Sequence, residues 1–196
     1  MAAGATRERI LDAAEDLFFN DGIATTGVDR VADAAGVAIA TLYKHVGSKD
    51  GLLEAVLARR LGSWTEHWDA ALASAPTPED RLLAVFDALA SYRASATRTQ
   101  WCCFLATASE RPRQAPTDPV AGLLEQDTAM LTTRFERLAA DVGLPDPADV
   151  AAQLLLLYNG ALASLLRGHP EDAVVRARGL AATVVSGSAQ RRQRSE

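Results

Sequence analysis

Residues 36–53 read GVAIATLYKHVGSKDGLL and concentrate side chains that bind phosphate. Hydroxyl, imidazole and ammonium groups stand close together here, among them those of Thr41, Tyr43, Lys44, His45 and Lys49. Groups of these types make many of the contacts between proteins and the sugar–phosphate backbone of DNA. The stretch is therefore a candidate nucleic-acid contact.

The formal charge changes sign at this stretch. The whole chain carries −5 at pH 7, which argues against a protein that coats nucleic acid indiscriminately. Residues 1–37 hold three basic and seven acidic side chains (3 − 7 = −4), whereas residues 38–60 hold four basic and two acidic ones (4 − 2 = +2). A local positive segment in an acidic chain favours a confined contact.

Other chemistry has little support. A cysteine and the three histidines could in principle form a nucleophilic pair, but His67 and His169 stand alone in the sequence, and neither HExxH nor CxxC occurs. We expect no enzyme activity, no metal site and no cofactor.

Cys102 and Cys103 are adjacent, which suits disulfide geometry poorly and indicates a reducing, cytoplasmic setting. A thiol that senses oxidants needs exposure and a lowered pKa, so a redox role for this pair stays open.

The chain shows neither a secretory signal nor a convincing membrane span. Its start lacks a basic segment followed by an apolar run and a cleavage site. The longest apolar run, from Val150 to Leu166, is short for a span and contains Gln153 and Asn159. We expect it to be a buried helix, and we expect no membrane partner.

Apolar residues recur at spacings of three and four almost throughout, which predicts an all-α fold of about nine helices. Thr77, Asp118 and Asp146 each precede a proline and are expected to cap a helix, as is Ser48. The expected helices cover residues 6–20, 27–35, 38–46, 48–74, 78–95, 100–110, 118–142, 147–167 and 170–186.

The helix expected over 48–74 would be about 40 Å long, enough to belong to two domains. We therefore predict a three-helix DNA-binding domain over 1–47 that continues into this helix, a helical regulatory and dimerisation domain over 48–187, and a flexible basic tail over 188–196. That tail could touch phosphate, although a solvated end is the plainer interpretation.

The helices expected over 27–35 and 38–46 have the features of a helix-turn-helix. Ala32 is the small residue at the crossing, Gly36 lies in the turn, and Thr26 is placed to cap the first helix with Asp29 as a weak partner. The inner face is expected to consist of Val28, Val31, Ala35, Val37 and Leu42.

The second helix of such a unit enters the major groove with its N-terminal part, so Ala38, Ile39, Ala40 and Thr41 would face base edges. Their methyl groups suit thymine methyls. The plainer alternative is an ordinary helical bundle, because an Ala-Gly-Val turn also occurs there and Tyr43 could be a core residue with a solvated hydroxyl.

Residues 6–61 as a whole resemble the DNA-binding domain of the TetR family of bacterial transcriptional regulators. The matching motif positions are Leu17-Phe18, Gly22, Thr26-Gly27-Val28, Val31-Ala32, Ala35-Gly36-Val37, Thr41-Leu42-Tyr43, His45-Val46, Ser48-Lys49 and Leu52. Two positions depart from the family pattern: Val46 replaces the usual Phe, and Ile39 takes a position that is often polar or basic.

The resemblance implies a regulator that binds a palindromic operator as a homodimer and is released by a small-molecule effector. Repression is the family's usual outcome, and activation is not excluded. The resemblance also implies a set of residues at the DNA: Thr26, Thr41, Tyr43, Lys44, His45 and Lys49. Of these, Tyr43 and Lys49 would be the main phosphate contacts. The segment Trp101–Glu110 resembles the family's Gly-Cys-apolar stretch ending in Ala-Ala-Glu, with Trp101 in place of Gly.

The last two expected helices are candidates for the dimer interface. Helix 147–167 is apolar on two faces and must be covered twice, and helix 170–186 offers small residues that allow close approach. The predicted interface residues are Leu154, Leu157, Ala161, Leu165, Val174, Ala177, Ala181 and Val185. Burial of both faces within one chain is the alternative.

Candidate effector contacts are large apolar residues and polar residues that interrupt apolar stripes. The set is Trp64, His67, Trp68, Phe86, Trp101, Phe104, Asp127, Thr128, Met130, Tyr158 and Asn159. Plain core packing is the competing interpretation for each of them. A competing function is a helical interaction protein that has kept the fold and lost DNA binding, for which Val46 and the acidic first helix are the hints.

Overall fold

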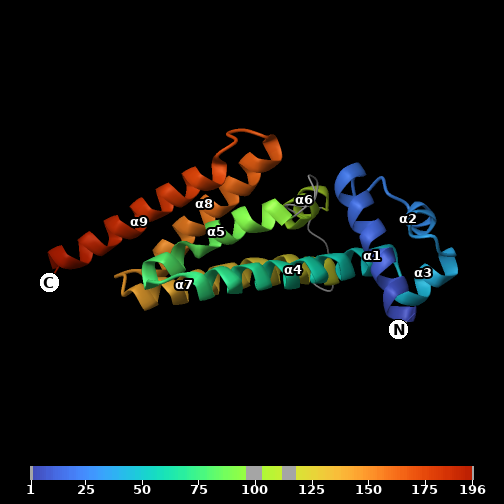
Figure 1. Ribbon diagram of the computed structural model, residues 1–196, viewed down its shortest axis with the longest axis horizontal. Helices are drawn as coiled ribbons and strands as arrows, with labels where there is room; N and C mark the ends of the chain where they lie inside the picture. The colour runs from blue at the N-terminus through green and yellow to red at the C-terminus, as the bar shows by residue number, and fades with distance from the viewer. Residues whose placement is uncertain (1, 96–102, 112–117, 196) are drawn as a thin grey trace. The chain divides into compact units, whose positions relative to one another are not determined.

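The computed structural model describes residues 2–95, 103–111 and 118–195, and every regular element in these ranges is a helix (Figure 1). The predicted all-α class is confirmed. The helices are α1 (Ala2–Asp21), α2 (Val28–Ala35), α3 (Ile39–Val46), α4 (Lys49–Ser74), α5 (Pro78–Ser95), α6 (Cys103–Glu110), α7 (Pro119–Val142), α8 (Pro147–Arg167) and α9 (Ala173–Ser195).

Most helices begin where the sequence predicted, because the predicted caps form. The Ser48 hydroxyl accepts a hydrogen bond from Gly51 N at 2.9 Å, and that of Thr77 accepts one from Asp80 N at 3.0 Å. The Asp146 carboxylate accepts from Asp149 N at 3.1 Å. Each bond satisfies an amide of the first turn that has no partner within its own helix.

Helix α9 differs from the prediction at both ends. It begins at Ala173 rather than at Pro170, and it continues past residue 186 to Ser195. The Arg191 guanidinium donates a hydrogen bond to the buried Ser188 hydroxyl at 2.7 Å. The segment expected to be a flexible tail is thus helical to Ser195, in keeping with the good helix propensities of Ala, Gln and Arg.

The chain divides into two compact units that are not contiguous in sequence. The first contains the described residues of 1–63 and 96–127, and the second those of 64–95 and 128–196. Helices α4 and α7 contribute residues to both units. The sequence had predicted contiguous domains, and the difference arises because α6 and the start of α7 complete the first unit.

The core of the first unit is built around α1. Ile10, Ala14 and Phe18 of α1 are buried, together with Leu53 and Leu57 of α4. Cys103 and Val120, far along the chain, belong to the same apolar cluster, and Phe104 packs against it. Helix α6 is therefore part of the scaffold that supports α1–α3.

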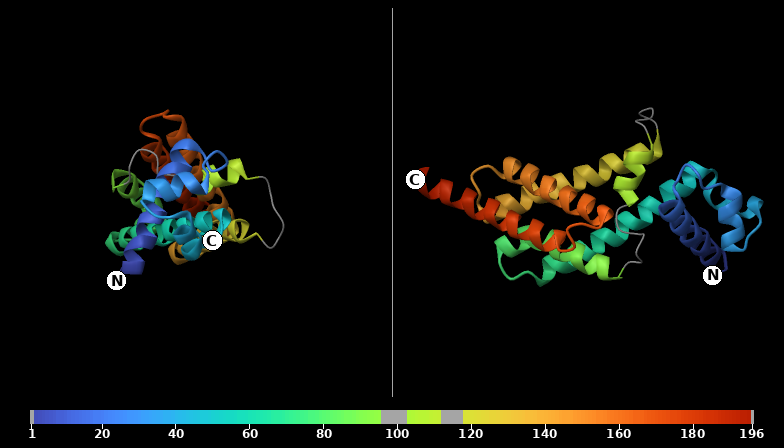
Figure 2. Two further views of the ribbon diagram at one scale, coloured as in Figure 1. Left: turned by 90° about the vertical axis from the view of Figure 1, so that its right-hand side faces the viewer. Right: turned by 90° about the horizontal axis from the view of Figure 1, so that it is seen from above.

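In the second unit, α5 buries almost every side chain between residues 82 and 89. Helices α8 and α9 lie side by side (Figure 2), and α5 also packs against α9. Within the described residues, α8 is the one helix whose length and composition would allow it to cross a membrane. Its most apolar window has a mean hydropathy of 1.4, and 39% of that window is buried inside the chain.

Candidate nucleic-acid interface

Helices α2 and α3 form the predicted helix-turn-helix. Gly36 ends α2 with φ +64°, a left-handed conformation that glycine adopts without strain, and Val37 N bonds to Ala32 O at 3.0 Å. Ala32 and Leu42 are fully buried where the helices meet. The turn fixes the angle at which α3 is presented.

The N-terminal end of α3 is exposed and consists of small or apolar side chains. Ala38 and Ala40 are exposed, and Ile39 is 44% exposed although it is a large hydrophobe. Thr41 is half-buried. Leu42 on the opposite side holds the helix against the core, so α3 presents this end to solvent, as major-groove recognition requires.

Hydroxyl and cationic side chains flank that end of α3. Tyr43 is 42% exposed, so the alternative that it is a core residue is wrong. Lys44 is exposed and His45 is half-buried. Lys49, half-buried at the start of α4, donates a hydrogen bond from Nζ to Ala24 O at 3.3 Å. The two lysines of the chain are Lys44 and Lys49, so both lie in this region.

Thr26 is the exception among the predicted DNA contacts. Its side chain is fully buried, and its hydroxyl donates to Gly22 O at 2.8 Å and Leu17 O at 3.2 Å. The residue that caps α2 is Gly27, with no side-chain hydrogen bond. The prediction that Thr26 caps α2 is therefore wrong, and its side chain points into the core rather than to solvent. Thr26 instead fixes the α1–α2 turn from inside.

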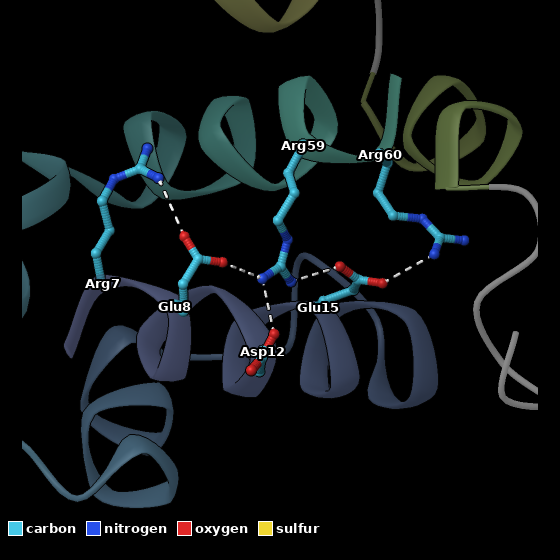
Figure 3. A network of polar contacts seen from close by, with 6 residues as sticks. All are labelled: Arg7, Glu8, Asp12, Glu15, Arg59 and Arg60. Atoms are coloured by element: carbon cyan, nitrogen blue, oxygen red, sulfur yellow. Dashed lines mark hydrogen bonds and ion pairs between the residues drawn. The ribbon is translucent and has the colours of Figure 1, made fainter. Parts of the chain in front are cut away.

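Three acidic side chains of α1 pair with one arginine of α4 (Figure 3). Arg59 binds Glu8 at 3.0 Å, Asp12 at 2.7 Å and Glu15 at 2.7 Å, and Arg60 binds Glu15 at 3.1 Å. Burial on its own would lower the pKa of Arg59, but the hydrogen bonds to these carboxylates raise it. Part of the acidity of α1 thus serves a structural contact with α4.

Cys103 lacks both properties of a sensing thiol. It is buried, and burial raises its pKa to about 11, although the nearby Arg60 opposes this shift. Cys102 lies outside the described residues. A redox role for Cys103 is not supported.

Helices α8 and α9 pack against each other within one chain, and the buried side of this pair, here called the seam, carries most of the residues predicted for the dimer interface. Leu154, Ala161 and Leu165 of α8 are buried, and so are Val174, Ala177, Ala181 and Val185 of α9, while Leu157 is half-buried. Seven of the eight predicted residues are therefore buried within one chain, because both faces of α8 are apolar and sequence alone does not say which one meets α9.

The opposite face of the α8–α9 pair, here called the outer face, is exposed and also apolar. Leu156 is 73% exposed and Val175 is 72% exposed. Leu180 is more than half exposed, and Leu166 is half exposed. Small residues separate these hydrophobes along both helices: Ala152, Gly160, Ala163 and Gly179. An exposed apolar patch of this kind on a soluble protein is typical of an interaction site.

Part of the predicted effector set forms an aromatic cluster in the second unit. Trp64 lies 6.1 Å from Trp68, 5.7 Å from Tyr92 and 5.8 Å from Tyr158 between ring centroids, and His67 lies 5.0 Å from Tyr92. Tyr92 escaped sequence analysis, although an aromatic residue on an otherwise apolar stripe of α5 was a signal for it.

Three buried donors in this cluster have no hydrogen-bond partner among the described residues. They are Trp64 Nε1, Trp68 Nε1 and Arg134 Nη1. The Arg134 guanidinium lies 4.6 Å from the Trp68 ring centroid and pairs with Asp69. Sequence analysis also missed Arg134, because a charged residue on a helix is ordinarily solvated. Buried donors without partners are costly and mark places where an acceptor would be stabilised.

The remaining residues of the predicted effector set are spread over both units. Phe104 and Asp127 belong to the first unit, where burial raises the pKa of Asp127 to about 6. Phe86 is buried in the second unit, Met130 is half-buried, and Thr128 and Asn159 are exposed. Trp101 lies outside the described residues.

Comparison with known proteins agrees with this architecture. Residues 10–56 match the family model described as "Bacterial regulatory proteins, tetR family". SCO4454, a TetR-family transcriptional regulator from Streptomyces coelicolor, has a TM-score of 0.85 at 26% identity over 94% of this chain and 96% of its own. The HTH-type transcriptional regulator YjdC of Escherichia coli is 28% identical over 91% of this chain and 93% of its own length.

Two regulators of Pseudomonas putida match more narrowly, at 41% identity over 58 residues, and the match spans only 27% and 43% of their lengths. A putative TetR-type regulator (sav143) from Streptomyces avermitilis is 31% identical over 94% of this chain and 98% of its own, with a TM-score of 0.78. These relatives are transcriptional regulators rather than enzymes. The family model matches the helix-turn-helix, and the Streptomyces avermitilis regulator is 31% identical over nearly the whole chain. The chain therefore belongs to the TetR family of bacterial transcriptional regulators.

Proposed function

We propose that this regulator binds a palindromic operator as a homodimer and that a small-molecule effector releases it from DNA. The observation that carries the proposal is the exposed N-terminal end of α3, where Ala38, Ile39 and Ala40 face solvent while Leu42 holds the helix to the core. A large exposed hydrophobe beside two alanines suits thymine methyl groups in a major groove.

The outer face of α8 and α9 supports the homodimer. Leu156 and Val175 are almost three-quarters exposed, and Gly160 and Gly179 allow a second helix pair to approach closely. A two-fold axis through this face makes the same surface serve both copies. Two α3 helices then enter successive major grooves about 34 to 36 Å apart, which demands a palindromic operator. The same contact accounts for the apolar character of α8 without a membrane.

The aromatic cluster supports an effector with an apolar, ring-containing body and an oxygen acceptor. Trp64 and Trp68 supply flat apolar surface, and their indole N–H groups and Arg134 Nη1 supply unpartnered donors. An effector that prefers a conformation unsuited to DNA weakens DNA binding, and DNA weakens effector binding by the same factor. The coupling free energy between the two sites is typically about 1 to 3 kcal/mol. Repression in the cytoplasm is the outcome that we propose.

The test is selection of bound duplexes from a random DNA pool at moderate salt, followed by sedimentation of the free protein. A recovered palindrome and a dimeric mass support the proposal. Leu156→Asp is expected to give monomers with much weaker binding to the palindrome, whereas Ala73→Asp, at an exposed site on α4, leaves both unchanged.

The competing function is a helical interaction protein that has lost DNA binding. Failure of the wild-type protein to bind any duplex even at low salt would favour it, because the electrostatic part of DNA binding is strongest there.

A further inference from the structure

Glu110, the last residue of α6, and Arg111, which follows it, contact the segments on either side of the helix-turn-helix. The Glu110 carboxylate accepts hydrogen bonds from Ile23 N at 2.8 Å and from Ala24 N at 3.2 Å. These amides belong to the turn between α1 and α2, and Ile23 is buried there. A residue 86 positions further along the chain thus holds the backbone of Ala24.

The backbone of Ala24 also holds Lys49. Its carbonyl accepts the hydrogen bond from Lys49 Nζ at 3.3 Å, so Ala24 is bound on its amide side by Glu110 and on its carbonyl side by Lys49. An ammonium has three donors, and this bond uses one of them. Two donors remain for a phosphate, and the bond to Ala24 fixes where they lie.

Arg111 acts on the residue that follows Lys49. Its guanidinium binds Asp50 at 2.5 Å and Asp118 at 3.2 Å, and its own side chain is only 14% exposed. Asp50 lies in the first turn of α4. Without Arg111, its carboxylate would stand uncompensated beside Lys49 and would repel a DNA phosphate.

We propose that Glu110 and Arg111 are positioning residues for DNA binding: Glu110 fixes the Lys49 ammonium through Ala24, and Arg111 compensates Asp50. The inference rests on the proposed function, in that Lys49 is taken to contact phosphate. Neither residue touches DNA itself. Their loss therefore weakens binding to all sequences alike and does not change the preferred operator.

The first test needs no DNA. The full-length protein is treated with limiting acetylating reagent, and acetylation of Lys49 is measured by mass spectrometry relative to Lys44, which serves as internal reference. Glu110→Ala is expected to raise the relative rate at Lys49 several-fold, and Glu110→Gln, which keeps an acceptor oxygen but loses the charge, is expected to give a rate between those of the wild type and Glu110→Ala. Ser109→Ala, next to it on the exposed side of α6, is the matched control.

A relative Lys49 rate in Glu110→Ala equal to that of Ser109→Ala would overturn the positioning role. Circular dichroism melting shows whether the variants fold, and Glu110→Gln keeps the test decisive if Glu110→Ala does not. In that case, a Lys49 rate in Glu110→Gln that lies between those of the wild type and of the unfolded chain supports the role. A rate in Glu110→Gln equal to that of the wild type overturns it.

The second test uses duplex DNA at several salt concentrations. Glu110→Ala is expected to weaken binding several-fold and to lower the salt slope by about 0.9, one phosphate contact, but to have no effect when Lys49 is already alanine. A full effect in the Lys49→Ala background would overturn the inference. Wild-type protein that protects Lys49 as expected but binds no duplex would instead refute the proposed function, so the two failures are distinguishable.

Arg111 is tested by a charge-matched pair. Arg111→Ala is expected to weaken DNA binding several-fold, and adding Asp50→Asn is expected to restore most of it because no uncompensated carboxylate then remains. Absence of any restoration in the folded double variant would show that Arg111 acts only on the fold and would overturn its proposed role.

Discussion

The indole rings of Trp64 and Trp68 lie one turn apart on α4 with centroids 6.1 Å apart, and both indole N–H groups are buried without a hydrogen-bond partner in the part of the chain that the structure describes. Two adjacent unsatisfied donors in an apolar core oppose folding unless they serve something else. Their position among Tyr92 and Tyr158 makes this cluster the site where we place the effector.

Substitutions of Trp64 should separate ring packing from its N–H group. Trp64→Phe is expected to change the free energy of unfolding by no more than about 1 kcal/mol, because the loss of ring area is offset by removal of a buried unsatisfied donor. Trp64→Ala should cost about 3 to 5 kcal/mol. Urea denaturation at fixed protein concentration measures both. A large loss in Trp64→Phe would mean that the indole N–H has a partner.

Lys49→Ala is expected to weaken binding to every duplex and to reduce the slope of log affinity against log salt by about 0.9, as loss of one phosphate contact requires. Fluorescence anisotropy with a labelled duplex at several salt concentrations gives the slope. The exposed Arg137, in the second unit, provides the control Arg137→Ala with an unchanged slope. A wild-type slope in Lys49→Ala would remove this residue from the interface.

Thr26→Val is expected to lower stability by about 1 kcal/mol, because the buried hydroxyl donates to Gly22 O and Leu17 O and its loss leaves their carbonyls without that bond. Sequence preference and salt slope should not change, since the side chain is buried. Thermal unfolding and the duplex assay test the two parts. Thr25→Val, at the exposed neighbour, should cost less. A changed operator preference would show that Thr26 takes part in DNA recognition.

Asp127→Asn is expected to stabilise the protein at pH 7.5 by on the order of 2 kcal/mol. Burial raises the pKa of Asp127 from 3.8 to about 6. The folded state therefore binds more protons than the unfolded state between these values, and this carboxylate lowers stability as the pH rises through that range. The penalty is complete above pH 6 and absent below about pH 4, where the variant and the wild type should be equal.

Urea unfolding of both proteins from pH 4 to pH 8 measures this difference. Asp141→Asn, at an exposed site of α7, should show no such dependence on pH. An Asp127→Asn variant that is less stable than the wild type at pH 7.5 would contradict the conclusion that burial of the Asp127 carboxylate destabilises the folded state.

The sequence by itself determined the helices and the helix-turn-helix. Capping side chains such as Ser48 and Asp146 act within one turn of their own helix, and Gly36 permits its turn whatever surrounds it. Such signals are local and survive without knowledge of the fold. The exposed end of α3 followed from the same pattern, because Leu42 fixes which side of the helix faces inward.

The tertiary structure alone decided which side chains of each element are buried and which distant groups meet. Both faces of α8 are apolar, so periodicity did not distinguish the seam at Leu154 from the outer face at Leu156. Thr26 is a polar residue in a turn, and its burial depends on the packing of α1. Glu110 meets Ala24 across 86 residues because α6 packs in the first unit. Local periodicity and capping arise from forces within one helix, whereas these contacts depend on how separate helices fit together.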